Sequence, residues 1–143
     1  MKNFEIIEHT ADIGIIAYGK TKEEVFVNSA KGMFYILTEE KEEVVSKNKF
    51  SYQLKLSADT LEDLLVSWLN ELLYIFETKL VILNKFVLEE FSDNNLIARV
   101  YGEDIGHNNK KIKREIKAVT YHYLEFKKDE VSKLWRARVI FDI

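Results

Sequence analysis

The chain has 143 residues, of which 47% are hydrophobic and 31% charged, as in an ordinary globular domain that can bury a core. It contains no cysteine, which excludes disulfides, thiolate metal sites and cysteine nucleophiles and fits a cytoplasmic protein. The formal net charge of −3 disfavours a dedicated nucleic-acid-binding protein, although it leaves room for a local basic patch. The sequence shows no signal-peptide pattern and no run approaching about eighteen apolar residues, so we expect neither secretion nor a membrane span.

The sequence contains no internal repeat, no low-complexity run and no proline, so we expect a single domain over residues 1–143. In the stretch IEHTADIGIIAYG (7–19), apolar residues alternate as they do in a β-strand. His9, Thr10 and Asp12 interrupt this apolar pattern where the strand begins. A solvated strand end would explain these polar residues, and so would a functional site.

The segment GKTKEEVFVNSAKGMFYILTEE (19–40) predicts a first helix. Thr21 followed by Glu24 matches a capping box, in which the two side chains accept hydrogen bonds from backbone N–H groups at the helix start. The apolar stripe of this helix consists of Phe26, Ala30, Met33 and Leu37. Gly32 interrupts the helical pattern, where it either weakens the helix slightly or marks close packing against a sheet.

The segment ADTLEDLLVSWLNELLYIFETK (58–79) predicts a second helix, with Asp59 and Glu62 as its N-terminal cap. Its apolar stripe consists of Leu61, Leu64, Leu65, Trp68, Leu69, Leu72, Leu73 and Phe76. Such a stripe can form a zipper with a partner helix, but it more often faces the core of its own domain. We therefore predict that Trp68 is a core residue.

The remaining segments predict strands and loops. Residues 44–58 indicate one strand, and residues 86–91 and 95–102 indicate two strands joined by a short turn. Residues 102–113 are polar and predict a loop, whereas residues 114–143 predict a hairpin with regularly alternating arms. Two helices and six or seven strands predict an α+β fold. We expect a two-layer α/β sandwich whose mixed, largely antiparallel sheet carries both helices on one face.

Most catalytic motifs are absent from the sequence, which contains no phosphate-binding loop, zinc-protease motif or nucleophile elbow. Alternation places Asp12 and Asp142 on the strand faces opposite their apolar neighbours, and the main-chain carboxylate of Ile143 follows directly. If the two strand ends meet, the three carboxylates converge. Such a set suits a hard cation, Ca²⁺ or Mg²⁺. The alternative is that both aspartates are solvated strand ends.

Lys117 is a second candidate, because it falls within the apolar run EIKAVTYH (115–122). A lysine is seldom fully buried without a partner, so this one either pairs with an anionic group or lies on the solvated face of a sheet.

Four blocks of the sequence resemble the archease family. They are HTADIGI (9–15), LLVSWLNELLYIFET (64–78), EIKAVTYHYLEF (115–126) and the final FDI (141–143). They occur in the family's order, and the resemblance extends over essentially the whole chain.

This resemblance implies a function that composition does not show. The archeases that this sequence resembles act as accessory proteins of the RtcB-type RNA ligase in tRNA splicing and RNA repair. They promote guanylylation of the active-site histidine of the ligase by GTP and support multiple turnover. The ligase is the direct partner, tRNA is reached only through it, and no enzymatic activity of the archease itself is expected.

The resemblance also implies an acidic metal site, which here maps to Asp12, Asp142 and Ile143. We expect a divalent cation, Ca²⁺ first, with Mg²⁺ or Mn²⁺ as alternatives. His9 and Thr10 are expected to support the ligands, and Lys117 to contact a carboxylate or an anionic partner group.

Two other functions remain open at this point. A metal-dependent hydrolase would use the same carboxylates, although it would need a base beside its metal, and only His9 offers itself. A helix-mediated scaffold would require the stripe over residues 61–76 to be exposed.

Overall fold

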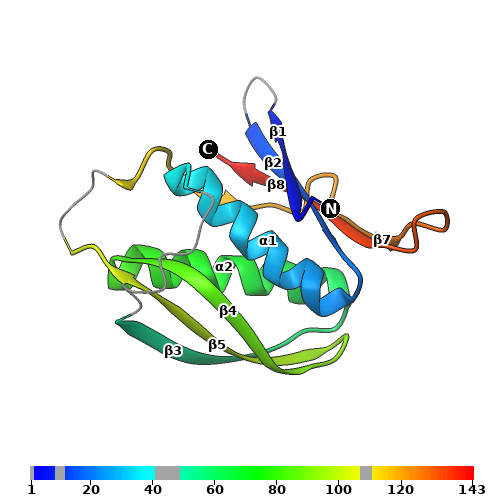
Figure 1. Ribbon diagram of the computed structural model, residues 1–143, viewed down its shortest axis with the longest axis horizontal. Helices are drawn as coiled ribbons and strands as arrows, with labels where there is room; N and C mark the ends of the chain where they lie inside the picture. The colour runs from blue at the N-terminus through cyan, green and yellow to red at the C-terminus, as the bar shows by residue number, and fades with distance from the viewer. Residues whose placement is uncertain (1, 9–11, 41–48, 107–110) are drawn as a thin grey trace.

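The structure is a computed structural model that describes residues 2–8, 12–40, 49–106 and 111–143. Two helices and eight strands are found in this part of the chain (Figure 1). In chain order they are β1 (Phe4–Glu8), β2 (Asp12–Gly19), α1 (Lys22–Thr38), β3 (Phe50–Ser57), α2 (Leu61–Lys79), β4 (Val81–Phe91), β5 (Asn95–Asp104), β6 (Ala118–Val119), β7 (Glu125–Lys128) and β8 (Trp135–Asp142).

The strands form two sheets with the helices between them (Figure 1). Sheet A has the order β1-β2-β8-β6, with β7 also paired to β8, and sheet B has the order β3-β5-β4. All strand pairs among the described residues are antiparallel. The α+β class and the antiparallel pairing are thus confirmed. The strands divide between two sheets, where the sequence analysis expected one, because β8 pairs with β2 from the other end of the chain.

Helix α1 begins at the predicted cap. The Thr21 hydroxyl accepts a hydrogen bond from the backbone N–H of Glu24 at 3.1 Å, and the Glu24 carboxylate accepts one from the backbone N–H of Lys20 at 2.6 Å. A Cβ on Gly32 would lie 3.2 Å from a methyl carbon of Ile15 in β2. Gly32 therefore marks close packing of α1 against sheet A, as one of the two readings of this glycine predicted.

Helix α2 supplies much of the core. Its N-cap is Thr60, whose hydroxyl accepts a hydrogen bond from the N–H of Asp63, one residue later than the predicted cap at Asp59. Trp68 is fully buried, and its indole N–H donates to the carbonyl oxygen of Phe26 in α1 at 2.9 Å. The buried residues of the stripe are Leu64, Leu65, Trp68, Leu69, Leu72 and Leu73. The stripe is core, which removes the basis for a helix-mediated scaffold.

The C-terminal strands differ from the sequence prediction. The hairpin consists of β7 and β8, whereas the first predicted arm is reduced to the two residues of β6. Ile116 and Val119 are both buried, so the expected alternation fails there. In sheet B, β4 and β5 extend the two strands predicted at 86–91 and 95–102. Of the strand predicted at 44–58, residues 44–48 lie outside the described residues.

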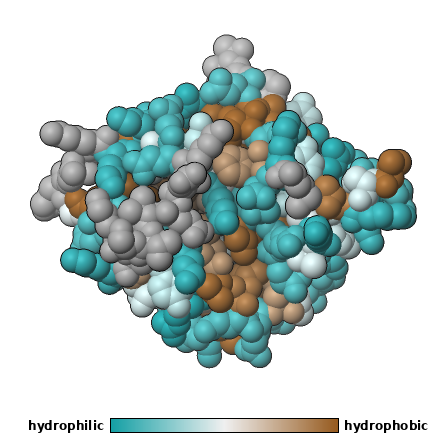
Figure 2. Space-filling model, viewed as in Figure 1, coloured by the Kyte–Doolittle hydropathy of each residue, from teal (hydrophilic) through white to brown (hydrophobic). Residues whose placement is uncertain are grey.

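Most of the molecular surface in Figure 2 is hydrophilic, and apolar residues emerge in limited areas near β1 and β2 and between α1 and sheet B. No helix in the described part of the chain combines the length and the apolar character that crossing a bilayer requires.

Candidate functional site

The two predicted aspartates lie opposite each other at one edge of sheet A. Asp12 is the first residue of β2 and Asp142 the last residue of β8, and the two are direct partners in the antiparallel register. Their neighbours Ile13 and Phe141 are buried toward the helices, so both carboxylates stand on the outward face of the sheet. Directly opposed residues on one face have Cβ atoms about 5 Å apart. The predicted meeting of the two strand ends is therefore confirmed.

One carboxylate oxygen of this pair has no hydrogen-bond partner among the described residues. Asp12 Oδ1 is buried, and no described residue donates a hydrogen bond to it. A buried anionic oxygen without a donor or a cation destabilises the fold, since its lost hydration is not replaced. Asp142, in contrast, is exposed. The Asp12 carboxylate therefore has room for a cation or for a hydrogen-bond donor that the described side chains do not supply.

A glycine and an isoleucine pack against each other beside this pair, and the sequence pattern alone did not indicate that either belongs to the site. Gly14 in β2 is the register partner of Ile140 in β8. A Cβ on Gly14 would lie 2.6 Å from Ile140 Cδ1 and 2.7 Å from the carbonyl oxygen of Val139, so only glycine fits there. Ile140 is 4% exposed although it faces outward. The one available signal was the glycine inside a strand pattern, which often marks close backbone approach.

Lys117 lies next to the pair through its backbone. Its N–H donates to the carbonyl oxygen of Asp142 at 2.7 Å, and the following residue, Ala118, is the register partner of Asp142. The side chain of Lys117 is exposed and lines a hollow with Arg114 and with Phe76 of α2. Lys117 therefore borders the site, but it precedes β6 and does not lie inside a strand.

Of the three remaining candidate residues, the structure describes only Ile143. Ile143 follows β8 directly, and its partly buried side chain packs against the core, which fixes the main chain beside Asp142. His9 and Thr10 lie outside the described residues.

The donors at this edge fit a divalent cation of the hard type. Carboxylate and main-chain oxygens are the ligands that such ions take, and the buried Asp12 Oδ1 supplies a position in need of a positive charge. No cluster of three or more His, Cys, Asp or Glu side chains occurs among the described residues. A cation bound by Asp12 and Asp142 would therefore complete its shell with main-chain oxygen or water.

The sequence model of the archease protein family matches residues 4–143. The archease of Methanosarcina mazei is 41% identical over 146 aligned residues, which cover 99% of this chain and 97% of that protein. The archease of Methanothermobacter thermautotrophicus is 34% identical over the full length of both. The chain therefore belongs to the archease family, as the resemblance indicated.

Solved structures agree with this assignment. The solution structure of protein 1598 from Methanobacterium thermoautotrophicum superposes with a TM-score of 0.80 at 34% identity, covering 100% of both chains. The crystal structure of an archease from Thermotoga maritima, described as a possible chaperone, gives a TM-score of 0.64 at 22% identity and covers 96% of this chain and 94% of that one. The second comparison shows a shared fold.

Proposed function

We propose that this protein is an accessory protein of an RtcB-type RNA ligase in the cytoplasm, acting in tRNA splicing and RNA repair. In this proposal it promotes guanylylation of the active-site histidine of the ligase and supports multiple turnover, without catalysing a reaction itself. Membership of the archease family supports the proposal.

The same proposal assigns one divalent cation to the edge of sheet A. Its ligands are the carboxylates of Asp12 and Asp142 and a main-chain oxygen of Ile143, with Ca²⁺ as the preferred ion and Mg²⁺ or Mn²⁺ as alternatives. The observation that carries this assignment is the register pairing of Asp12 with Asp142, together with the buried Asp12 oxygen, to which no residue in the described part of the chain donates. A bound cation would turn this acidic edge into a surface that attracts phosphates or carboxylates of the partner.

The surrounding residues have separate roles in this proposal. Gly14 and Ile140 hold the two strands close, which keeps the paired carboxylates in place. Lys117, whose backbone N–H bonds to Asp142, offers an exposed ammonium group on the neighbouring hollow, where it can meet an anionic group of the ligase. His9 and Thr10 are assigned to hydrogen bonds that orient the ligands.

Calorimetric titration with Ca²⁺ tests the cation assignment without any ligase. The wild type should bind one ion, and Asp12→Asn and Asp142→Asn should each bind much more weakly, since each loses an anionic ligand. Glu130→Gln is the matched control, because Glu130 is an exposed carboxylate of the β7–β8 turn and its loss changes the charge equally. Equal Ca²⁺ affinity in Asp12→Asn and the wild type would remove Asp12 from the site.

Single-turnover labelling of the cognate ligase with radioactive GTP at limiting metal tests the function. The wild type should raise the rate of guanylylation, and Asp12→Ala should abolish this effect while keeping its circular dichroism spectrum. Full activation by Asp12→Ala would contradict the proposed mechanism. Hydrolysis of a phosphoester or anhydride by the protein alone would favour the metal-dependent hydrolase instead.

A further inference from the structure

Positive charge is concentrated in the C-terminal part of the sequence. Residues 110–143 contain 10 of the 21 Lys and Arg residues but only 5 of the 24 Asp and Glu residues, a net charge of +5. Residues 1–109 contain the remaining 11 basic and 19 acidic residues, a net charge of −8. Strands β6, β7 and β8 all come from the basic part and all belong to sheet A. The net charge of the whole chain therefore conceals a basic region.

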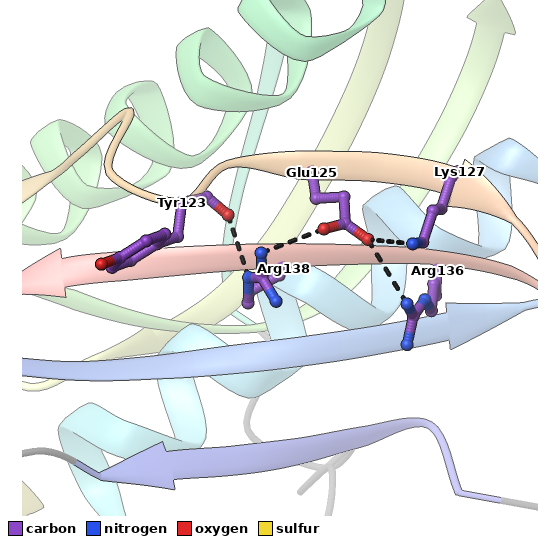
Figure 3. A network of polar contacts seen from close by, with 5 residues as sticks. All are labelled: Tyr123, Glu125, Lys127, Arg136 and Arg138. Carbon is purple, nitrogen blue, oxygen red and sulfur yellow. Dashed lines mark hydrogen bonds and ion pairs between the residues drawn. The ribbon is translucent and has the colours of Figure 1, made fainter.

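Three of these basic side chains form a compact group on the face of sheet A that is turned away from the helices (Figure 3). Lys127 of β7 is the register partner of Arg136 of β8, and Glu125 that of Arg138. The Glu125 carboxylate lies 2.8 Å from Lys127 Nζ, 3.0 Å from an Arg138 nitrogen and 3.4 Å from an Arg136 nitrogen. We call Lys127, Arg136 and Arg138 the basic ladder. The Glu125 carboxylate neutralises one of the three charges, and Asp129, which lines a hollow together with Arg136, partly offsets another. The basic ladder still carries more positive than negative charge.

Aromatic rings flank the basic ladder on both sides. The Tyr123 side chain, next to Arg138, is 67% exposed, and the Arg138 guanidinium carbon lies 5.9 Å from the ring centroid. The Arg138 Nε–H donates to the carbonyl oxygen of Tyr123 at 3.0 Å, and the ring of His122 lies 4.3 Å from that of Tyr123. At the other end, Tyr18 of β2 is the register partner of Arg136, and both line a hollow of about 400 Å³. Aromatic rings from β2 and from the turn before β7 thus lie beside the two guanidinium groups of β8.

We propose that the basic ladder, together with Tyr123 and Tyr18, binds single-stranded RNA. A guanidinium group binds a phosphate through two parallel hydrogen bonds, and an exposed ring stacks on a base of any identity. A duplex hides its base faces in the stack, whereas a single strand presents them. An acidic protein surface would use the three cations but would leave the exposed ring of Tyr123 without a contact. The choice of RNA over DNA rests on the proposed ligase partner. The binding of a single strand is argued from the residues of the ladder and does not depend on that partner.

The basic ladder is separate from the carboxylate pair but shares its sheet face. Asp142, Ile140 and Arg138 occupy successive positions on the outward face of β8, so about 13 Å of strand separate the first from the last. The buried Ile140 lies between them. An RNA strand on the ladder would contact this protein directly, beside the acidic edge, which departs from the sequence-based expectation that RNA is reached only through the ligase.

Fluorescence anisotropy with a labelled oligouridine and this protein alone tests the proposal. The wild type should bind at low salt, and the logarithm of its association constant should fall with the logarithm of salt concentration with a slope between about −1.4 and −2.1, as expected for two or three phosphate contacts. Arg136→Gln/Arg138→Gln should weaken binding about tenfold or more at low salt. Tyr123→Ala should weaken it about fivefold or more, whereas Tyr123→Phe should retain it.

Two matched variants separate this site from general electrostatic attraction. Lys55→Gln/Arg99→Gln removes two charges from the outward face of sheet B and should leave binding unchanged. Glu125→Gln removes the carboxylate inside the ladder and should tighten binding. Where the double arginine variant fails to fold by circular dichroism, Arg138→Lys keeps the charge but loses the planar fork, and it should still bind more weakly.

Several results would overturn the proposal. They are absence of oligouridine binding by the wild type at low salt, an equal loss in the sheet B control, and equal affinity for duplex RNA. If polyglutamate competes as well as RNA and Tyr123→Ala has no effect, the ladder is a docking surface for an acidic protein. Because no ligase is present in this assay, failure of the ligase proposal would leave the result unchanged.

Discussion

The helical layer and the outward face of sheet A differ in what their side chains do. In the helical layer, large apolar groups such as Trp68 are fully removed from water. The outward face of sheet A instead carries a carboxylate pair at one end and the basic ladder at the other. Burial of apolar area stabilises a fold, whereas charges held on a surface contribute little and mainly recognise other molecules. In our proposals the outward face of sheet A serves recognition and the helical layer serves stability, so each variant below should affect mainly one of them.

The largest expected effect is that of Trp68→Ala. Truncating a buried tryptophan costs roughly 3–5 kcal/mol of unfolding free energy, and this variant also loses the hydrogen bond to the Phe26 carbonyl. Trp135→Ala is the matched control, because Trp135 is only half-buried at the start of β8. Urea denaturation followed by far-ultraviolet circular dichroism should show a much smaller loss for Trp135→Ala. Equal losses would mean that the full burial of Trp68 in the helical layer stabilises the fold no more than the partial burial of Trp135.

The next largest effect is expected at Gly14, where a substitution should lower both stability and Ca²⁺ affinity. Gly14→Ala forces a methyl group against Ile140 and the backbone of Val139, and overpacking of this kind costs about 1–3 kcal/mol. It should also weaken Ca²⁺ binding, since β2 and β8 must move apart beside the carboxylate pair. Gly32→Ala is the control, because its methyl group would meet only side-chain atoms at 3.2 Å or more and alanine favours a helix. A harmless Gly14→Ala would contradict the tight β2–β8 contact.

A smaller and opposite effect is expected at the end of α2. Leu80 is the C-cap with φ 56° and ψ 50°, a left-handed conformation that costs a non-glycine residue about 1–2 kcal/mol. Leu80→Gly should therefore raise the unfolding free energy by about 1 kcal/mol. The packing of the lost leucine side chain, which is 37% exposed in the wild type, reduces this gain. Leu80→Ala is the control, because it loses the same packing without relieving the backbone. A glycine variant no more stable than the alanine variant would mean that the cap is unstrained.

The two helices were predictable because their signals are local. The leucine stripe of α2 and the Thr21–Glu24 cap lie within a few turns of sequence, and the structure confirms both. The cap of α2 was misplaced by one residue because Asp59 and Thr60 are both good N-caps and only the backbone decides between them. Local patterns of this kind do not depend on what the rest of the chain does.

The division into two sheets was not predictable, since it depends on pairing between distant segments. β8 joins β2 across most of the length of the chain, and no local pattern indicates that β3, β4 and β5 form a sheet of their own. The Asp12–Asp142 pair was predicted only on the condition that those strand ends meet. The fit of Gly14 against Ile140 was missed because it depends on register, which one residue of slippage would change.

The smallest expected effect is the pH dependence of the basic ladder. The hydrogen bond from Lys127, and then the charges of Arg138 and Arg136, lower the pKa of the Glu125 carboxyl below its ordinary value near 4.5. A depressed pKa in the folded state means that the ionised carboxylate stabilises the fold above the ordinary value. This contribution is lost as the pH falls from the ordinary value through the lowered one. The basic ladder should therefore add to stability at neutral pH and cease to do so in acid.

Urea midpoints of the wild type and Glu125→Gln, measured from neutral pH down to about pH 3, check this expectation. The wild type should be slightly the more stable at neutral pH, and the two midpoints should converge in acid. Glu130→Gln serves as the control, because Glu130 is 88% exposed and lies 3.9 Å from Lys133, too weak a pair to give a measurable pH dependence. If the difference in midpoint between wild type and Glu125→Gln persists in acid, Glu125 stabilises the fold through packing or neutral hydrogen bonds. The outward face of sheet A would then contribute more to stability than its surface charges alone.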